Sequence, residues 1–293
     1  MDRPKGLGWL PDVPKPNDYT EAHAKVAPLL EKTRLAGRTG AAAAGAVGAL
    51  PPKVDLRATF SPVENQGYLG SCTANAACGL LEYFERRTSG KYVDASRLFV
   101  YKAERNLLGW TGDTGAYLRT AMEALVLFGA PPERYWPYDG NPPETNTLFD
   151  VEPPAFMYAF GANYQAIRYF RLDPPGSTPA GALASIKLFL AHGFPCMFGF
   201  PVYSEYDNPL PGGLIAYPGA GSNYRGGHAN VIAGYDDNVK IGADKGAVLV
   251  RNSWGTQWAD NGYGWMSYRY VTDQLANDFW SMISSEWVNT GVF

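Results

Sequence analysis

Three residues that lie far apart in this sequence carry the side chains of a possible nucleophilic centre: Cys72, His228 and Asn252. A free thiol is only about a few per cent ionised at neutral pH, so catalysis needs an imidazole beside it and a positive local potential. An amide can then fix the orientation of the imidazole. His228 is the candidate base, because His23 lies near the N-terminus and His192 ends a predicted helix.

The segments around these residues carry a family resemblance. They read Asn65-Gln66-Gly67-Tyr68-Leu69-Gly70-Ser71-Cys72, then Gly227-His228-Ala229-Asn230, then Arg251-Asn252-Ser253-Trp254-Gly255. Together they resemble the papain-like cysteine peptidases, of a bacterial type with a short N-terminal leader. The resemblance covers roughly residues 51 to 290. Each motif alone has an ordinary structural explanation, and the combination favours the functional one.

The resemblance implies a role for each residue of the centre. Cys72, placed after the natural N-cap Ser71, would attack a peptide carbonyl and form an acyl-enzyme. His228 would act first as base and then as acid, and Asn252 would orient it. Gln66, six positions before Cys72, would stabilise the oxyanion together with a backbone amide. Neither a cofactor nor a metal is expected, although reducing conditions are.

The residues expected to contact substrate follow from the same resemblance. A glycine-rich strand that pairs with the peptide backbone is expected at Gly112, Asp113, Thr114 and Gly115, with Gly227 and Trp254 at the histidine side. Ser284 and Ser285 are candidates for a specificity pocket. Two departures from the family, Thr73 and Asn75 in place of aromatic residues, predict different packing behind Cys72.

Composition limits the possible partners. The net charge of −3 and the pI of about 5.7 argue against nucleic acid, which requires a basic surface. The histidines and the three cysteines lack the spacing of a zinc site, and Cys78 and Cys196 are interpreted as small buried residues. We expect a monomer that acts on a peptide or protein, with no membrane partner. The polar first residues lack a signal-peptide core, which leaves cytoplasmic action, leaderless export or a trimmed chain open.

The order of elements predicts an α+β papain-like fold with two lobes and the active site between them. Residues 1–50 form a leader and linker, residues 51–155 a mainly helical lobe, and residues 156–293 a mainly antiparallel, barrel-like β lobe. Helices are predicted from Cys72 onward and over about 95–108, 115–128 and 180–191, with a possible helix over 19–35. Strands are predicted over 194–203, 228–235, 246–252 and 262–271, with a hairpin loop over 236–245.

The leader suggests that the activity of the enzyme is regulated by its own N-terminal segment. The apolar phrase Gly8-Trp9-Leu10-Pro11-Asp12-Val13-Pro14 is suited to a groove, and we hypothesise that residues 1 to about 40 lie across the cleft and inhibit the enzyme. The main prediction is therefore a cysteine peptidase inhibited by its N-terminal segment. Two alternatives stay open: a cysteine-dependent amidase or acyltransferase, and a catalytically inactive peptide-binding homologue.

Overall fold

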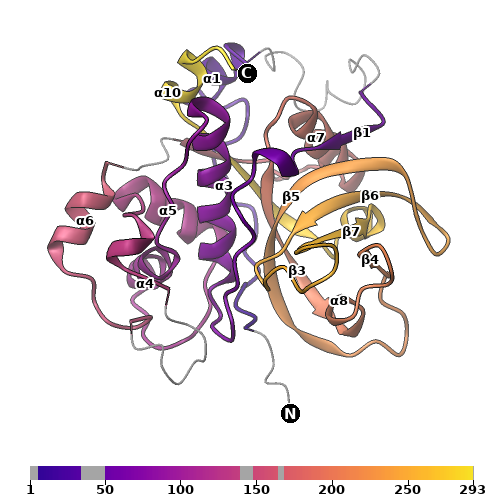
Figure 1. The fold of residues 1–293 in the computed structure, drawn as a ribbon. Coiled ribbons are helices and arrows are strands. Elements are labelled where there is room, and N and C mark those ends of the chain that lie inside the picture. Colours follow the sequence, from indigo (N-terminus) through magenta and orange to yellow (C-terminus); the bar gives the residue numbers. More distant parts are fainter. Residues whose placement is uncertain (1–5, 34–49, 139–147, 164–167, 293) are drawn as a thin grey trace.

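The protein is described by a computed structural model that covers residues 6–33, 50–138, 148–163 and 168–292. Helices α4, α5 and α6 gather on one side of the molecule and the strands on the other, together with α7 and α8, and the long helix α3 lies between the two sides (Figure 1). The α-helices are α1 (Ala27–Glu31), α3 (Cys72–Ser89), α4 (Arg97–Leu108), α5 (Leu118–Phe128), α6 (Ala155–Gly161), α7 (Pro179–Ala191), α8 (Ser204–Asp207), α9 (Arg269–Thr272) and α10 (Ser285–Asn289), and the 3₁₀ turns are η2 (Arg57–Thr59) and η3 (Glu133–Tyr135).

The strands form one sheet in the order β2-β8-β3-β5-β6-β7-β4, with β1 paired to β5 beside this path. All the pairs are antiparallel except β4 with β7. The path ends at β2 and β4, so the sheet is open and is barrel-like only in a loose sense. The strands are β1 (Lys53–Asp55), β2 (Arg168–Arg171), β3 (Cys196–Tyr203), β4 (Leu214–Ile215), β5 (Tyr224–Ile241), β6 (Asp244–Arg251), β7 (Tyr263–Ser267) and β8 (Asn277–Ile283).

Local sequence signals fix the ends of the main helices. Ser96 caps α4 by accepting a hydrogen bond from the amide of Phe99, and Gly109 ends that helix with a φ of 70°. Gly90 ends α3 in the same left-handed conformation, with a φ of 74°. A residue without a Cβ adopts this conformation at little cost. Both helices thus stop at a glycine that follows their apolar stretch.

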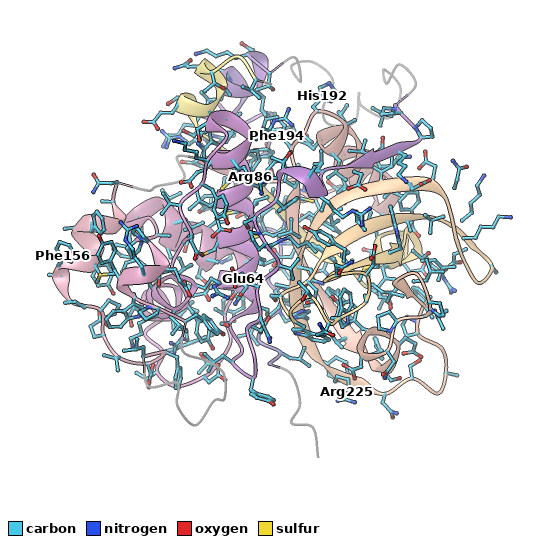
Figure 2. All side chains as sticks on the ribbon, viewed as in Figure 1. Glu64, Arg86, Phe156, His192, Phe194 and Arg225 are labelled. Atoms are coloured by element: carbon cyan, nitrogen blue, oxygen red, sulfur yellow. The ribbon has the colours of Figure 1, made fainter. Side chains whose placement is uncertain are left out.

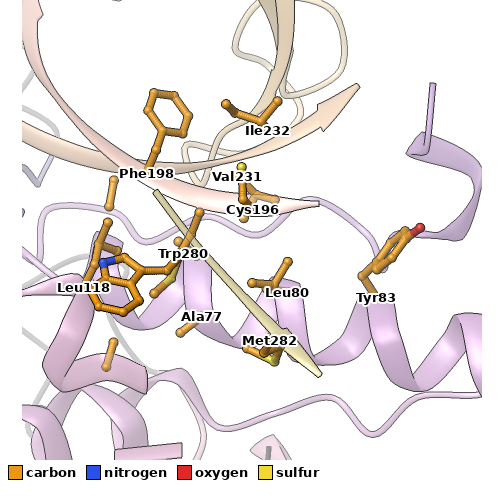
Figure 3. Packing of buried hydrophobic residues seen from close by; sticks show 14 of the residues in the cluster. Ala77, Leu80, Tyr83, Leu118, Cys196, Phe198, Val231, Ile232, Trp280 and Met282 are labelled. Atoms are coloured by element: carbon orange, nitrogen blue, oxygen red, sulfur yellow. The ribbon is translucent and has the colours of Figure 1, made fainter. Parts of the chain in front are cut away.

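The core lies where α3 meets the sheet. Ala77 and Leu80 of α3 face Cys196 of β3 and Met282 of β8, and all four are at most 1% exposed (Figure 3). Burying such side chains stabilises the fold by roughly 1.5–3 kcal/mol for each large aliphatic residue. This packing holds the first turn of α3 against the strands. Charged residues such as Arg225 lie at the periphery (Figure 2).

Most predicted elements are present, with three corrections. The helix proposed over 19–35 is reduced to α1, because Pro28 is tolerated only in the first turn of a helix; residues 34 and 35 lie outside the described residues. The hairpin loop is shorter than 236–245, since β5 and β6 continue to Ile241 and Asp244. The strand predicted over 262–271 ends at Ser267 and is followed by α9.

Candidate active site

Cys72 is the first residue of α3 and is completely buried. Ser71 stands at the N-cap position but makes no capping bond, because its hydroxyl pairs with the Tyr138 hydroxyl at 2.7 Å. Burial raises the pKa of the Cys72 thiol to about 12, although the backbone amides of Ala229 and Gly8 favour the thiolate. The activating effect expected from the helix N-terminus is therefore outweighed by desolvation in this arrangement.

The two residues that depart from the resembled family, Thr73 and Asn75, lie buried in the first turns of α3. The hydroxyl of Thr73 donates to Oε1 of Glu104 at 2.8 Å, and both residues are buried. Burial raises the pKa of Glu104 well above its usual range. A buried carboxyl that bonds to a neighbour costs less than an isolated one. A small polar pair thus fills the space next to the nucleophile.

His228 and Asn252 come together from neighbouring strands. The distance between Nε2 of His228 and Oδ1 of Asn252 is 2.8 Å. His228 lies in β5 and Asn252 directly follows β6, and both are fully buried. The indole of Trp254 covers this pair, with its ring centre 4.8 Å from that of the imidazole. The amide of Ala229, which follows His228, reaches Cys72 and brings β5 beside α3.

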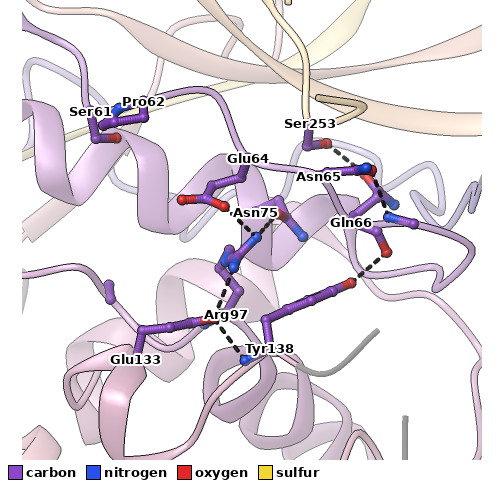
Figure 4. Close-up of polar contacts among 12 residues, drawn as sticks. Ser61, Pro62, Glu64, Asn65, Gln66, Asn75, Arg97, Glu133, Tyr138 and Ser253 are labelled. Atoms are coloured by element: carbon purple, nitrogen blue, oxygen red, sulfur yellow. Dashed lines mark hydrogen bonds and ion pairs between the residues drawn. The ribbon is translucent and has the colours of Figure 1, made fainter. Parts of the chain in front are cut away.

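Gln66 has its side chain fixed from both ends. Its Oε1 accepts a hydrogen bond from the Ser253 hydroxyl at 2.5 Å, so that Nε2 points the other way (Figure 4). Nε2 donates to the carbonyl of Leu69 at 2.7 Å and to that of Gly6 at 3.2 Å. The amide therefore presents its N–H groups to carbonyl oxygens next to the first turn of α3.

A polar network that sequence reasoning missed supports this loop. The Tyr138 hydroxyl donates to the Gln66 carbonyl at 2.7 Å and also meets the Ser71 hydroxyl. Arg97, buried at the start of α4, pairs with Glu133 at 2.8 Å, and its guanidinium lies over the face of the Tyr138 ring, 4.3 Å from its centre (Figure 4). The spacing between these residues follows no periodic pattern, so only the folded chain reveals them.

The predicted peptide-pairing strand divides into two parts with different partners. The carboxylate of Asp113 bonds to the body of the protein, where Oδ1 accepts from the Gly70 amide at 2.9 Å and from the Tyr101 hydroxyl at 2.5 Å. Gly112 and Thr114 bond to each other through their backbones, and Gly115 has a φ of 71°. Ala116, which was not predicted, carries the backbone groups that pair with another segment.

That segment is residues 6–10, which we call the cleft segment. Its indigo trace runs between the helices and the sheet (Figure 1). Its backbone bonds to three places at the predicted site: the Gln66 loop, Ala116 directly after Gly115, and Gly227, the residue before His228. The bonds are Gly6 N to Gly67 O at 3.1 Å, Ala116 N to Gly8 O at 2.8 Å, Leu10 N to Ala116 O at 3.0 Å and Trp9 N to Gly227 O at 3.2 Å.

The cleft segment lies so close to the body that it has no room for side chains at two positions. A Cβ on Gly6 would stand 1.9 Å from the Leu69 carbonyl oxygen, and one on Gly8 would stand 1.8 Å from that of Gly70. Trp9 follows these two glycines; its indole is 4% exposed and packs against Gly199 of β3. Glycines allow the backbone to approach, and the tryptophan provides the apolar contact.

Two carboxylates anchor the residues that follow. Asp12 Oδ2 lies 2.6 Å from Nε of Arg119, and Asp18 pairs with the same guanidinium. Asp18 also lies 3.8 Å from Arg171 of β2, whose amide donates to the carbonyl of Tyr19. The side chain of Asp18 is 1% exposed. Buried pairs of this kind are strongly destabilised when one partner is removed.

The other predicted residues lie away from this centre. His192 ends α7 near the upper edge of the view in Figure 2, and its Nδ1 lies 2.9 Å from the Leu188 carbonyl. Cys78 and Cys196 are buried and free, as predicted. Ser284 caps α10. In the described part of the chain, no cluster of three histidine, cysteine or acidic residues is arranged to bind a metal, and no helix is long and apolar enough to cross a membrane.

Comparison with known proteins places this geometry in context. The model of the papain family cysteine proteases matches residues 50–279. An uncharacterized peptidase C1-like protein of Acanthamoeba polyphaga mimivirus is 34% identical over 233 residues, which are 78% of this chain and 71% of that protein. Chicken (Gallus gallus) cathepsin K is 29% identical over 73% of this chain, and the alignment spans 58% of the cathepsin.

A solved structure resembles the whole chain. The crystal structure of xylellain, a cysteine protease from Xylella fastidiosa, aligns with a TM-score of 0.73 and 32% identity. The alignment covers 97% of this chain and 98% of xylellain. Procathepsin L 3 of Tenebrio molitor, at 18% identity and a TM-score of 0.61, shares the fold.

Proposed function

This chain belongs to the papain family of cysteine proteases, which are hydrolases, and from that premise we propose that Cys72, His228 and Asn252 cleave peptide bonds while the cleft segment inhibits them. The predicted family and the two-lobed α+β fold are confirmed by the family match and by the full-length likeness to xylellain.

The proposed reaction needs no group beyond the chain and water. The Cys72 thiol gives its proton to His228, and the thiolate adds to the peptide carbonyl. The tetrahedral oxyanion collapses, the C–N bond breaks, and His228 passes the proton to the leaving amine. Water then gives a proton to His228 as it attacks the thioester, and Cys72 recovers that proton when the carboxylic acid leaves.

The contact between His228 and Asn252 is the observation that carries this proposal. The Asn252 amide oxygen, 2.8 Å from Nε2, accepts a hydrogen bond from the Nε2–H group, which leaves Nδ1 as the nitrogen that exchanges protons with the nucleophile. Trp254 is 4% exposed and shields the contact, which strengthens it electrostatically. A binding protein without activity has no need for this arrangement around a buried cysteine.

Inhibition is supported by what the cleft segment occupies. The carbonyl of Gly6 accepts the hydrogen bond of Gln66 Nε2, which is the group expected to receive the oxyanion. The amide of Gly8 bonds to Cys72, and Cys72 is fully buried beneath it. A substrate carbonyl would need the same donor and the same space. The intact chain is therefore proposed to be a closed, inactive form.

Hydrolysis of internally quenched peptides under reducing conditions tests this proposal. We expect little cleavage by the intact chain and ready cleavage by a chain that begins at Leu50, with none in either form after Cys72→Ala. Equal activity of the two forms would remove the inhibitory role. Persistent cleavage after Cys72→Ala would remove the proposed nucleophile, and acyl transfer to an amine in excess of hydrolysis would favour the acyltransferase alternative.

A further inference from the structure

The space that holds the Trp9 side chain, which we call the Trp9 pocket, is built by three strands. Gly199 of β3 forms one wall, and a Cβ there would stand 1.9 Å from Cε2 of the indole. Gly227 of β5 forms another, with its Cβ position 3.0 Å from Cε3. Asp278 of β8 lies at the indole nitrogen. Each wall belongs to the body of the protein, so the pocket does not depend on the cleft segment.

Asp278 is oriented by the body and presents one oxygen to the pocket. Its Oδ1 accepts from Nε1 of Trp280 at 2.7 Å and lies 3.0 Å from Arg171. Its Oδ2 accepts from Nε1 of Trp9 at 3.1 Å. The residue is fully buried and has a φ of 63°, a left-handed conformation that is uncommon for a residue with a side chain. Unusual backbone of this kind often marks a residue placed for binding.

The charge of this carboxylate is balanced within the body. Arg171 contacts both Asp278 and Asp173, and the guanidinium groups of Arg119 and Arg171 lie over the Trp280 ring, 5.1 Å and 5.0 Å from its centre. In the intact chain Asp18 and Asp12 add to the same cluster through these arginines. Without residues 6–33, which include Asp12 and Asp18, Arg119 and Arg171 remain beside Asp173 and Asp278. The pocket then has an acceptor for a hydrogen bond but no excess negative charge that would select a cation.

We propose that Gly199 and Asp278 make this pocket selective for a substrate side chain that is large, flat and neutral and carries one N–H donor, namely tryptophan. The inference rests on the proposed function, because it assumes that substrate enters the space that Trp9 occupies. Gly199 supplies the room for the double ring, and Asp278 binds the nitrogen. A site built around a hydrogen bond rejects analogues that lack the donor, because its own polar group is then left unpaired. Phenylalanine would fit by size and fail by this criterion.

The substrate test uses the full chain with Gly8→Ala, a change that displaces the cleft segment. Internally quenched peptides carry Trp, Phe, Leu or Arg at each position from three before to two after the cleaved bond. We expect one position where Trp exceeds Phe and Arg by about 10- to 100-fold in kcat/KM. Equal cleavage of Trp and Phe, or a preference for Arg at that position, would overturn the proposal.

Gly199→Ala in the same background is the matched variant, since it fills the pocket without touching Cys72, His228 or Gln66. It should reduce cleavage of the tryptophan peptides at least tenfold and leave the leucine peptides within about threefold. An equal loss for both peptides would indicate a general defect and contradict the assigned role. Absence of all Cys72-dependent cleavage would instead refute the proposed function.

A second measurement does not depend on catalysis. In the otherwise unchanged full chain, Trp9→Phe keeps the ring contact and removes the donor to Asp278. The rate of Cys72 alkylation, followed by mass spectrometry, should rise about tenfold or more, whereas Leu10→Ala, next to it, should change the rate less. An unchanged rate with Trp9→Phe would show that the bond to Asp278 does not help to hold an indole in the Trp9 pocket, which would contradict the proposal.

Discussion

Gly8 lies against Gly70 so closely that a methyl group on Gly8 would stand 1.8 Å from the Gly70 carbonyl oxygen. Both partners at this contact are backbone, so neither can move aside by a side-chain rotation. The nearest atoms are a carbonyl oxygen, its carbon and the Gly70 Cα, all belonging to the loop that leads into α3. The docking of the cleft segment is therefore sensitive to the smallest possible substitution.

Gly8→Ala should convert the intact protein into an active protease without any cleavage of the chain. The added methyl group cannot be accommodated, so the cleft segment leaves and exposes Cys72. We expect peptide hydrolysis and Cys72 alkylation to rise by at least tenfold, measured side by side. Val13→Ala is the control: Val13 is 73% exposed, so this substitution should leave both rates unchanged. Unchanged rates in Gly8→Ala would contradict the inhibitory role of residues 6–10.

Gln66→Ala should separate catalysis from binding. In the Gly8→Ala background we expect kcat to fall about 10²–10³-fold with KM changed by less than about threefold, because an oxyanion donor acts in the transition state. Gln66→Glu provides a matched comparison of nearly equal size that lacks the donor. Steady-state kinetics on one efficiently cleaved peptide separate the two constants. If kcat/KM falls mainly because KM rises, Gln66 acts in substrate binding instead.

Asp18→Asn should loosen the N-terminal segment from a distance. Asp18 is buried and pairs with Arg119, so its neutralisation leaves the arginine charge without its closest partner. Removal of one partner of a buried pair costs about 3–5 kcal/mol, enough to raise opening of the segment by about 10²–10³-fold. Hydrogen exchange of residues 6–33 measures this opening directly. Lys15→Ala, which removes a half-exposed cation 3.8 Å from Asp12, should change it little.

The pH dependence of Cys72 alkylation should differ between the closed and opened forms. Burial raises the pKa of the thiol to about 12 in the closed form, so its alkylation rate should climb about tenfold per pH unit throughout the range from 7 to 11. Rising pH above about 8.5, the ordinary thiol value, also weakens docking, since the exposed thiol ionises first. In the Gly8→Ala protein the alkylation rate should level off at a lower pH. Identical pH profiles for the two proteins would disprove the effect of burial.

The sequence predicted the parts of the fold that depend on local pattern. The helices over 95–108, 115–128 and 180–191 appear within three residues of their expected bounds, because glycines and apolar periodicity mark them. β2 and β8 were missed, since their pairing with each other and with β3 joins segments far apart in the chain. Periodicity within one segment carries no information about such distant partners.

The candidate site divides in the same way. His228 and Asn252 could be named from motifs, and the structure brings their side chains together. Tyr138, Arg97 and Asp278 could not, because each acts through a contact that only tertiary structure creates. The sequence pointed to Ser284 as a pocket residue, whereas Ser284 lies just beyond β8 and caps α10, and it is Asp278 at the start of β8 that contacts Trp9. A role that depends on a neighbour brought close only by the fold cannot be predicted from a sequence motif.

The cleft segment and the catalytic residues belong to one polypeptide, and this connection sets how the proposed inhibition responds to dilution. A tethered segment meets its site at an effective concentration of about millimolar, whatever the amount of protein in solution. One cut between Thr33 and Leu50 would abolish that tether while leaving every contact of residues 6–33 in place. The same interface would then behave as a complex of two molecules. Inhibition would persist in a concentrated sample and fade on dilution, so a single nick would act as a delayed release whose timing is set by the dissociation rate.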